Sequence, residues 1–343
     1  MNQTKTIEKK SPMMAFVELV SGFWISQAMN VAAKLGIADL LTEEAKSIDE
    51  LAQATNTHAP SLYRLLRTLA SVGVFTEVEP HCFALTEIGE YLRSDNPDSL
   101  RYQAIMHGDE WHWQGIGEMF RTVKDGKPGL QHLYGFDSYW EYLAQNPEFQ
   151  SSFNKAMLGV SKNYHTPLIE SYDFSKFTKV VDVAGGEGIF LSSILKANPH
   201  LHGVLFDMPS TITKAADFIE REGLMERCET VGGDVFKSVP IGGDVYTMSY
   251  IMIDWDDNSC LKILKSIRRA ISDNGKLLII DSIIPSGDQS SWIKWVDLFE
   301  LCLGYGKVRT EAEFREIFQQ AGFQCLETFS VGTPSSLMEL APV

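Results

Sequence analysis

The chain has 343 residues, of which 44% are apolar and 22% are charged, so it is long enough for two domains with sizeable cores. Its formal net charge of -15 disfavours DNA or RNA as the main partner, because nucleic-acid affinity depends on basic residues that neutralise phosphates. The scattered cysteines form no Cys-x-x-Cys pair, which predicts reduced thiols and a cytoplasmic location. They are Cys82, Cys228, Cys260, Cys302 and Cys325.

The amino-terminal segment is polar and shows no signal-peptide pattern, so we expect a frayed tail. From Met13 to Lys34 apolar residues crowd more than one face of a predicted helix, which must therefore be buried. Polar residues interrupt this stretch, so it falls short of the roughly 20 apolar residues that span a bilayer, and no membrane partner is expected. A small domain has little interior for such a helix. We therefore expect a homodimer in which a second subunit covers it.

Two further helices are predicted downstream. Ser47 and Glu50 form a capping-box pattern that starts a helix at about 48–54. Leucines recur with helical spacing over residues 59–70, which predicts an amphipathic helix.

Two extended runs, at 74–78 and 82–85, predict a hairpin after these three helices. Three helices followed by a hairpin are typical of a winged-helix module. Its recognition stretch carries only Arg64 and Arg67 in an acidic protein, so dimerisation is the better interpretation than DNA reading.

After residue 177 the pattern alternates between strands and helices. The predicted strands are 180–184, 203–206, 229–231, 244–248 and 276–281, and the predicted helices are 189–196, 211–221 and 259–271. This alternation indicates an α/β fold with a doubly wound, mostly parallel sheet.

A glycine-rich segment, 182–188, joins the first of these strands to a helix. Glycines let the backbone pass close to a ligand, and the helix start offers N–H groups to an anion. The dinucleotide fingerprint requires a third glycine at the position of Leu191, so a nicotinamide cofactor is disfavoured. Asp207 ends the second strand, where a carboxylate accepts hydrogen bonds from ribose hydroxyls. Asp234 follows the third strand and is a candidate acceptor for an adenine amino group.

Eight short motifs, spread over the chain, together match the pattern of a single protein family. They lie at 32–41, 62–67, 83–86, 181–188, 206–209, 233–236, 253–255 and 306–310. With these motifs the chain, from about Phe16 to Val343, resembles the plant caffeic-acid-type and bacterial O-methyltransferases that carry a winged-helix dimerisation domain.

The resemblance implies an α/β fold in which a Rossmann-like doubly wound methyltransferase sheet follows an N-terminal all-helical winged-helix dimerisation domain. It implies a dimerisation domain at 1–100, a helical linker region lining the acceptor pocket at 101–175, and an S-adenosyl-L-methionine-binding domain at 176–343. The implied activity is methyl transfer to a small-molecule acceptor of secondary metabolism.

The resemblance also implies a set of cofactor-binding positions. Ala184, which replaces a usual glycine, lies with its neighbours at the methionine end of the cofactor, Asp207 binds ribose, and Asp234 with Val235 holds adenine. Ser249 stands where plant members often have a lysine. The full set is Asp182, Ala184, Gly185, Gly186, Gly188, Asp207, Met208, Asp234, Val235 and Ser249.

The catalytic pair of the plant enzymes is missing. Plant members place a histidine directly before the Asp-Trp pair and a glutamate that orients it in the later Gly-Lys-Glu-Arg-Thr motif. This chain has Ile253 and Val308, which cannot transfer or orient a proton. We therefore expect an acceptor that is already nucleophilic, or one that is activated by another group. O-methylation is the default, with C- or N-methylation as alternatives.

Candidate replacement bases come from segments 106–113 and 162–165 and from the Asp-Trp pair. They are His112 and His165, with His107 beside them, and Asp254; packing or hydrogen-bonded structural roles are the alternative for each. No metal site is expected, because no His-x-x-His or His-x-x-x-His pair occurs. A nicotinamide-dependent oxidoreductase and a non-catalytic cofactor-binding scaffold remain the competing functions.

Overall fold

The computed structural model describes residues 11–136, 138–330 and 333–343, which form two compact units. One unit comprises the chain up to residue 113 and residues 147–159, and the other comprises 114–146 and 160–343. Helix α10 (Pro147–Ser171) contributes to both. The boundaries of these units differ from the predicted boundaries at residues 100 and 175. The predicted boundaries separate segments by their expected roles, and that division stays a prediction. The predicted frayed tail at 1–10 lies outside the described residues.

The first unit contains the helices and the hairpin that the sequence predicts. Its elements include α1 (Pro12–Leu35), α2 (Ile37–Leu40), β1 (Lys46–Ser47), α3 (Ile48–Thr55), α4 (Ala59–Ser71), β2 (Phe75–Glu79), β3 (Cys82–Leu85) and α5 (Arg101–Gly108). The capping box of Ser47 and Glu50 is present at the start of α3. The strands form a sheet in the order β1-β3-β2, so "all-helical" is too narrow a description of this module. The winged-helix pattern is confirmed.

Helix α1 is buried in its carboxyl-terminal half and exposed in its amino-terminal half. Ala32 and Ala33 are buried, and the side-chain amide of Asn30 donates a 2.7 Å hydrogen bond to the carbonyl oxygen of Ile105 on α5. The amino-terminal half carries exposed apolar side chains, which include Met13, Phe16, Leu19, Val20, Phe23 and Trp24. An exposed apolar surface of this kind marks an interaction site.

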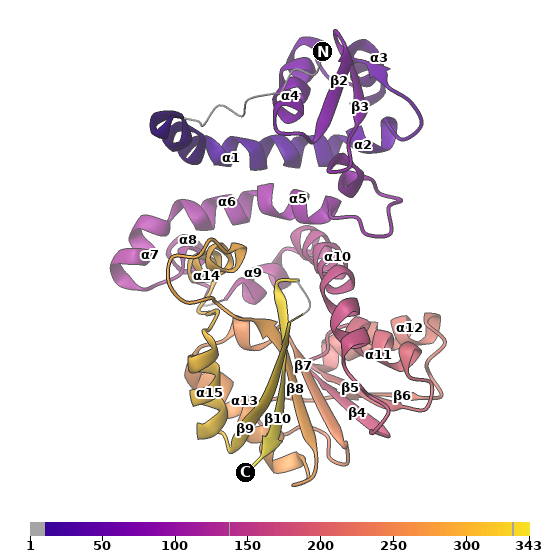
Figure 1. Cartoon of the computed structure of the whole chain (residues 1–343), viewed down its shortest axis with the longest axis vertical. Coiled ribbons are helices and arrows are strands. Elements are labelled where there is room, and N and C mark those ends of the chain that lie inside the picture. The colour runs from indigo at the N-terminus through magenta and orange to yellow at the C-terminus, as the bar shows by residue number, and fades with distance from the viewer. Residues whose placement is uncertain (1–10, 137, 331–332) are drawn as a thin grey trace, which may run out of the picture. The chain divides into compact units, whose positions relative to one another are not determined.

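The second unit is built on a seven-stranded sheet in the order β6-β5-β4-β7-β8-β10-β9 (Figure 1). The strands are β4 (Lys179–Val183), β5 (His202–Asp207), β6 (Cys228–Gly232), β7 (Val245–Ser249), β8 (Lys276–Ser282), β9 (Phe323–Ser330) and β10 (Ser335–Pro342). The first five strands of this order pair in parallel, and β10 pairs antiparallel with both of its neighbours. The mostly parallel sheet is confirmed, and β9 and β10 add an antiparallel edge that the sequence analysis does not predict.

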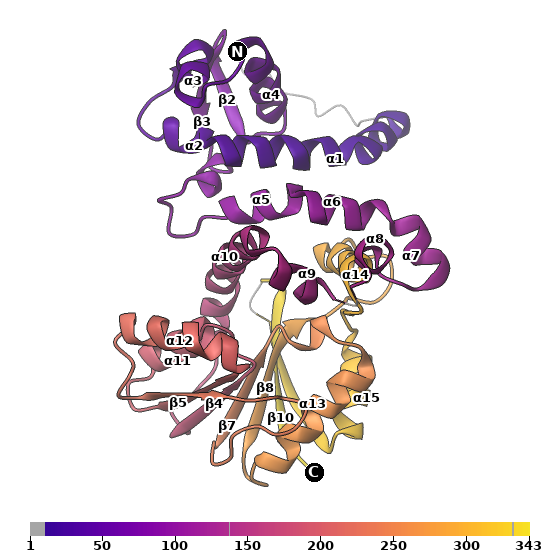
Figure 2. The same cartoon turned by 180° about the vertical axis from the view of Figure 1, so that it is seen from behind.

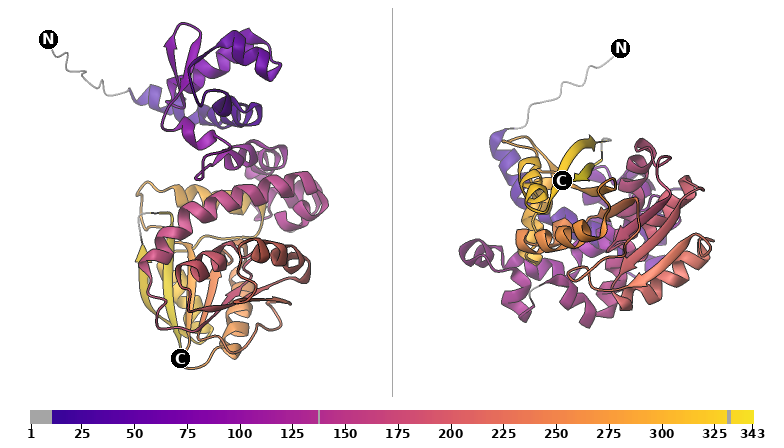
Figure 3. Two further views of the ribbon diagram at one scale, coloured as in Figure 1. Left: turned by 90° about the vertical axis from the view of Figure 1, so that its right-hand side faces the viewer. Right: turned by 90° about the horizontal axis from the view of Figure 1, so that it is seen from below.

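Helices cover both faces of this sheet (Figures 2 and 3). On one face lie α10, α11 (Ile189–Ala197) and α12 (Pro209–Arg221), and on the other α13 (Asp257–Ala270) and α15 (Glu311–Gln320). Neighbouring strand residues alternate between the two cores: Val181 packs with α13 and α15, and Val180 packs with the other helices. Leu191 is fully buried in this second core, so a core side chain fills the position of the missing third glycine.

Shorter helices complete the second unit. They include α7 (Met119–Asp125), α8 (Gly129–Tyr134), α9 (Tyr139–Gln145), the 3-10 helix η2 (Met252–Asp254) and α14 (Trp292–Leu303), while α6 (Glu110–Gly117) crosses from the first unit. No helix in the described part of the chain is both long and apolar enough to span a bilayer. All five cysteines are free thiols and four of them are buried, as the sequence predicts.

We predict that Leu19→Glu dissociates a homodimer formed through α1. Leu19 is 77% exposed within one chain, and a carboxylate at that position would have to be desolvated in the interface. The dimer dissociation constant should rise by at least about tenfold, or about 1.4 kcal/mol, measured by light scattering across a dilution series. Ile241→Glu is the matched control, because Ile241 is 76% exposed in the other unit. A wild-type chain that is monomeric at micromolar concentration would contradict the prediction.

Candidate active site

The glycine-rich segment forms the loop between β4 and α11 at the carboxyl edge of the sheet. Gly186 and Gly188 have positive φ angles of 59° and 88°. A Cβ atom on Gly188 would lie 2.9 Å from a methyl group of Leu205, so this position requires glycine. A Cβ atom on Gly186 would meet nothing within 4 Å, so the backbone there faces open space. Ala184 also has a positive φ, 56°, which explains why glycine suits this position in relatives.

Hydrogen bonds tie the ends of three parallel strands together at this loop. The N–H of Gly186 donates to Oδ2 of Asp207 at 2.9 Å, and the N–H of Met208 donates to Oδ1 of the same carboxylate at 2.7 Å. The N–H of Gly233, just after β6, donates to the carbonyl oxygen of Asp207 at 2.9 Å. Asp207 therefore organises the loop that follows each of these strands.

The donor set fits a nucleoside cofactor. Each carboxylate oxygen of Asp207 accepts one backbone N–H and retains capacity for a further hydrogen bond, and the side chain is only partly buried. A ribose diol has two donors that match these two oxygens. The open space beside Gly186 leaves room for a ligand to approach the backbone.

Asp182 lies beneath this loop, with no exposed surface. Its Oδ1 accepts a 2.7 Å hydrogen bond from the hydroxyl of Thr247 on β7, and its Oδ2 has no hydrogen-bond partner among the described residues. Burial raises the pKa of this carboxyl to about 7. A Cβ atom on Gly185 would lie 2.3 Å from Oδ2, so the loop packs directly on this side chain.

The remaining predicted cofactor residues lie at the ends of β5, β6 and β7. Met208 is 61% exposed and precedes α12. Asp234 is exposed, accepts a hydrogen bond from the N–H of Phe236 at 3.0 Å, and pairs with Lys237 at 3.1 Å. The side-chain hydrogen bond from Lys237 is the main cause of the lowered pKa of Asp234. Val235 packs against the core shared with α13.

The structure brings two predicted site residues together at the end of β7. Nε2 of His165, on α10, lies 3.0 Å from the hydroxyl oxygen of Ser249. The imidazole packs edge-on against Phe190, and burial lowers its pKa to about 4. His165 is therefore neutral at pH 7 and a weak base. The side chain of Lys162 in the same predicted segment is outside the described part of the structure.

His112 belongs to the other unit, on α6. It has no exposed surface, its ring centroid lies 4.0 Å from that of Trp111, and His107 lies beside it. Burial lowers the pKa of His112 well below its usual range. This environment favours a neutral, packed imidazole. No cluster of three or more metal-ligating side chains occurs in the described ranges.

The two positions that the resemblance assigns to the catalytic pair do meet in space. Ile253 and Val308 are buried and pack in one small apolar cluster with Ile293. The N–H of Ile253 donates to Oδ2 of Asp281 at 3.2 Å, and the N–H of Val308 donates to Oδ1 of Asp297 at 2.9 Å. An apolar contact thus stands where a proton-transferring pair would otherwise lie.

A group of acidic side chains lies beside this apolar contact. The hydroxyl of Tyr139, on α9, donates a 2.8 Å hydrogen bond to Oδ1 of Asp254. Glu300, on α14, is 6% exposed, and its Oε2 has no hydrogen-bond partner among the described residues. The Glu300 carboxyl and the backbone of Asp254 both lie against Gly306: a Cβ atom there would be 3.0 Å from Oε2 of Glu300 and 3.3 Å from Cα of Asp254. Asp281 is buried behind them at the end of β8.

Burial dominates the ionisation of this group. It raises the pKa of Asp254 to about 7, with Asp281 adding repulsion and the Tyr139 hydrogen bond opposing the rise. It also raises the pKa of Glu300 well above its usual range, and repulsion from Asp254 is the next largest cause of that rise. The neutral form of Glu300 is therefore favoured when Asp254 is ionised.

Arg309 holds the wall of this site in place. Its guanidinium has no exposed surface and donates to the carbonyl oxygens of Met252 at 2.7 Å and Trp255 at 2.8 Å. It also binds the carboxylate of Asp257 at 2.8 Å through Nε. The loop that contains residues 306–310 is thereby fastened to η2 and to the start of α13.

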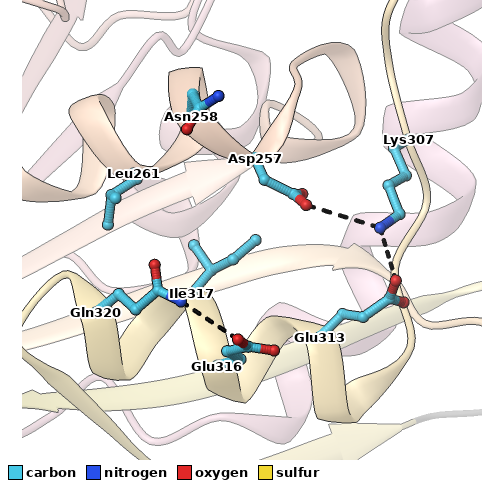
Figure 4. A pocket seen from close by; sticks show the side chains of 8 residues that line it. All are labelled: Asp257, Asn258, Leu261, Lys307, Glu313, Glu316, Ile317 and Gln320. Atoms are coloured by element: carbon cyan, nitrogen blue, oxygen red, sulfur yellow. Dashed lines mark hydrogen bonds and ion pairs between the residues drawn. The ribbon is translucent and has the colours of Figure 1, made fainter.

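A polar surface hollow of about 210 Å³ lies on the outer side of this loop (Figure 4). Its lining consists of Asp257, Asn258, Leu261, Lys307, Glu313, Glu316, Ile317 and Gln320. Inside it the amine of Lys307 pairs with Glu313 at 2.6 Å and with Asp257 at 3.8 Å. No predicted site residue lines this hollow, and its ion pairs support the loop that Arg309 fastens.

Sequence reasoning misses three residues of the acidic group: Tyr139, Asp281 and Glu300. Asp281 could have been found, because it ends a predicted strand at the ligand-binding edge of the sheet. Tyr139 and Glu300 lie on helices for which no pattern indicates a site. Only the packing of α9 and α14 in this unit brings them to Asp254.

Comparison with known proteins identifies the class. Residues 113–324 match the model of an O-methyltransferase domain, and residues 17–95 match that of an O-methyltransferase dimerisation domain. The phenazine O-methyltransferase PhzM of Lysobacter antibioticus is 41% identical over 95% of each chain. A mitomycin biosynthesis 6-O-methyltransferase of Streptomyces lavendulae is 32% identical over 94% of this chain and 93% of its own.

Solved structures agree. The crystal structure of LaPhzM has a TM-score of 0.90, with 40% identity over 97% of this chain and all of the other. The neocarzinostatin-biosynthesis O-methyltransferase NcsB1, solved with S-adenosylmethionine and 2-hydroxy-5-methyl naphthoic acid, has a TM-score of 0.81, with 31% identity over 97% of this chain and 99% of its own. The fold and the matches define an S-adenosyl-L-methionine-dependent methyltransferase of small molecules. The chain belongs to the O-methyltransferase family of secondary metabolism, with a dimerisation domain that supports a homodimer.

We predict that Asp207→Ala weakens the binding of S-adenosylhomocysteine by about 1–3 kcal/mol, the usual cost of removing a charged acceptor. The substitution also releases the N–H groups of Gly186 and Met208. Isothermal titration calorimetry measures the effect, and circular dichroism checks the fold. Asp217→Ala, at an exposed position on α12, is the control. An unchanged dissociation constant would show that Asp207 only organises the strand ends.

We predict that Arg309→Lys lowers the free energy of unfolding by about 2–4 kcal/mol. A lysine cannot reproduce the planar set of donors, so buried carbonyl oxygens lose their partners. Denaturant titration measures the change. Arg221→Lys is the control: Arg221 is exposed, binds Asp217 and Phe218 of its own helix, and should shift stability by less than about 0.5 kcal/mol. Equal stabilities of the two variants would contradict the role given to Arg309.

Proposed function

We propose that this enzyme methylates a hydroxyl group on an aromatic ring system. One observation carries this proposal: two features lie at the carboxyl edge of the sheet. The glycine-rich loop that Asp207 holds follows β4, and η2 follows the neighbouring parallel strand β7. Relatives named for phenazine, mitomycin and naphthoate chemistry support an aromatic or quinone-like acceptor. S-adenosyl-L-methionine supplies the methyl group from an activated sulfonium.

In this proposal each part of the strand edge binds one part of the cofactor. The loop of Ala184, Gly185, Gly186 and Gly188 faces the methionine end, with Asp182 supporting it from below. Asp207 accepts hydrogen bonds from the ribose hydroxyls. Asp234, Val235 and Met208 bind the adenine, and Ser249 with His165 lines the end of β7. Residues 101–175 contribute to the acceptor pocket, and 176–343 hold the cofactor.

The same proposal includes the partners of the enzyme. A homodimer that buries the exposed apolar residues of α1 agrees with the dimerisation-domain match. We expect the enzyme to work in the cytoplasm without nucleic-acid or membrane partners, and the net charge of -15 supports the exclusion of nucleic acid. Leu191 in the core speaks against a nicotinamide fingerprint.

A panel of acceptors tests the proposal. Purified enzyme with S-adenosylmethionine should release S-adenosylhomocysteine with a hydroxyphenazine or with 2-hydroxy-5-methylnaphthoate, and mass spectrometry should place the new methyl group on oxygen. The matching aminophenazine tests N-methylation in the same assay. Methylation of the amine alone would replace the proposed function with N-methyl transfer. Release without any acceptor at the same rate would contradict an acceptor of either kind.

A further inference from the structure

The acidic group of Tyr139, Asp254 and Glu300 has no evident structural purpose. Two carboxyls that repel each other in a buried place destabilise the fold unless they share a proton. Asp254 caps no helix: the neighbouring Asp256 caps α13, through the N–H of Ser259 at 2.8 Å. Among the described residues, the Tyr139 hydroxyl is the side-chain donor to Asp254.

Geometry leaves room for a further polar group at this place. Oε2 of Glu300 is buried and has no partner among the described residues, which costs free energy unless a ligand or water satisfies it. Gly306 leaves the space beside Oε2 free of a side chain, because a Cβ atom would lie 3.0 Å from that oxygen. Asp254 is partly exposed, so the group is reachable from solvent.

The position in the fold points to the reaction. Asp254 follows directly on Ile253, one of the two positions where the family pair is missing, and the backbone N–H of Lys307 donates to the carbonyl oxygen of Ile253 at 2.8 Å. Arg309 fixes the same turn through Met252 and Trp255. The backbone at Asp254 is thus fixed beside the apolar cluster of Ile253 and Val308, and the Tyr139 hydroxyl orients its carboxylate.

We propose that Asp254 binds the hydroxyl group of the acceptor and takes its proton, with Glu300 and Tyr139 as positioning residues that hold one shared proton beside it. This inference rests on the proposed function. As the acceptor O–H bond breaks, its proton goes to a carboxylate oxygen of Asp254 and its electron pair forms the new O–CH₃ bond. The S–CH₃ bond breaks with its electron pair left on sulfur, so charge and atoms balance.

This arrangement selects the chemistry of the acceptor. Two carboxyls that share one negative charge repel an acceptor atom that arrives as an anion. They favour a neutral hydroxyl, which donates a hydrogen bond to Asp254 and accepts none from it. A base is most effective when its pKa lies near the working pH, and that of Asp254 is about 7. The acceptor class is therefore a neutral, weakly acidic hydroxyl and not a carboxylate.

Other charged groups near Asp254 and Glu300 also affect the pH at which these two carboxyls ionise. Asp281 on β8 and Asp297 on α14 add repulsion, and Arg309 offsets part of it at Asp281. Burial raises the pKa of Tyr139 well above its usual range, so this hydroxyl keeps its proton. Substitutions at Glu300 and Tyr139 change the surroundings of Asp254 and leave its carboxylate, the proposed base, in place.

The first test measures single-turnover rates against pH with the hydroxyl acceptor that the panel shows to be turned over. The wild-type rate should rise with pH through about 7 as Asp254 ionises. Asp254→Asn should lower the rate by about 10²- to 10⁴-fold and remove this rise. Glu300→Gln should leave the rise near pH 7, because Glu300 still carries its proton when Asp254 ionises. Tyr139→Phe should move it to higher pH, because it removes the hydrogen bond that stabilises the carboxylate.

Asp273→Asn and Glu316→Gln are the matched controls. Both are exposed, and Asp273 lies at the amino end of β8, away from the site. They should leave the rate and its pH dependence unchanged. A pH rise that survives in Asp254→Asn, or one that does not move in Tyr139→Phe, would overturn the proposal while leaving the proposed function intact.

A second readout needs no acceptor. Because the folded pKa values of both carboxyls are raised above the ordinary value of about 4, the native state binds more protons than the unfolded state between pH 5 and 7. Stability from this pair is therefore greatest at low pH and is lost as pH rises through about 7. Unfolding of Glu300→Gln should release about one proton fewer than wild type in this window, measured from the pH dependence of denaturant unfolding.

Equal proton release from wild type and Glu300→Gln would overturn the shared proton. If the panel finds no hydroxyl acceptor, the proposed function fails and Asp254 loses its assigned substrate. The proton-release measurement then reports on the carboxyl pair alone, so the two failures are distinguishable.

Discussion

The wall of the active site depends on one buried cation. Arg309 has no exposed surface, and its guanidinium joins the turn at 252–255, the start of α13 and its own loop through hydrogen bonds that only a planar set of donors can make at once. The backbone positions of Ile253 and Asp254 follow from this clamp. The ion pairs of Lys307 on the outer surface reinforce the same loop. This buried charge thus decides where the backbone of residues 252–255 lies.

A second constraint is the common carboxyl edge of the parallel strands. Asp207 accepts N–H groups from two loops and holds the strand ends together, and each of its oxygens keeps a lone pair for a further hydrogen bond. Because β4 to β7 end at this edge, the glycine-rich loop and η2 become neighbours without any long connection. In our proposal, the fold therefore brings a nucleoside site and a buried acidic group together within one unit.

Ile253 and Val308 form an apolar cluster with Ile293 at the positions to which the family resemblance assigns a catalytic pair. These apolar side chains add no buried polar atom that would need a partner. Oε2 of Glu300 is a buried polar atom with no partner among the described residues, and our proposal places the proton chemistry beside it.

The sequence by itself determined the class of fold, the helices of the winged-helix module, five strands of the sheet and the cofactor motif, because these depend on local periodicity, capping and glycine spacing. It also identified Asp254, which directly follows a recognisable motif position. Tertiary structure alone decided that Tyr139 and Glu300 meet Asp254, since they come from helices far apart in the chain, and that Ile253 contacts Val308. Local sequence patterns determine which face of a helix is apolar. The packing of segments that are distant in the chain decides which buried side chains become neighbours.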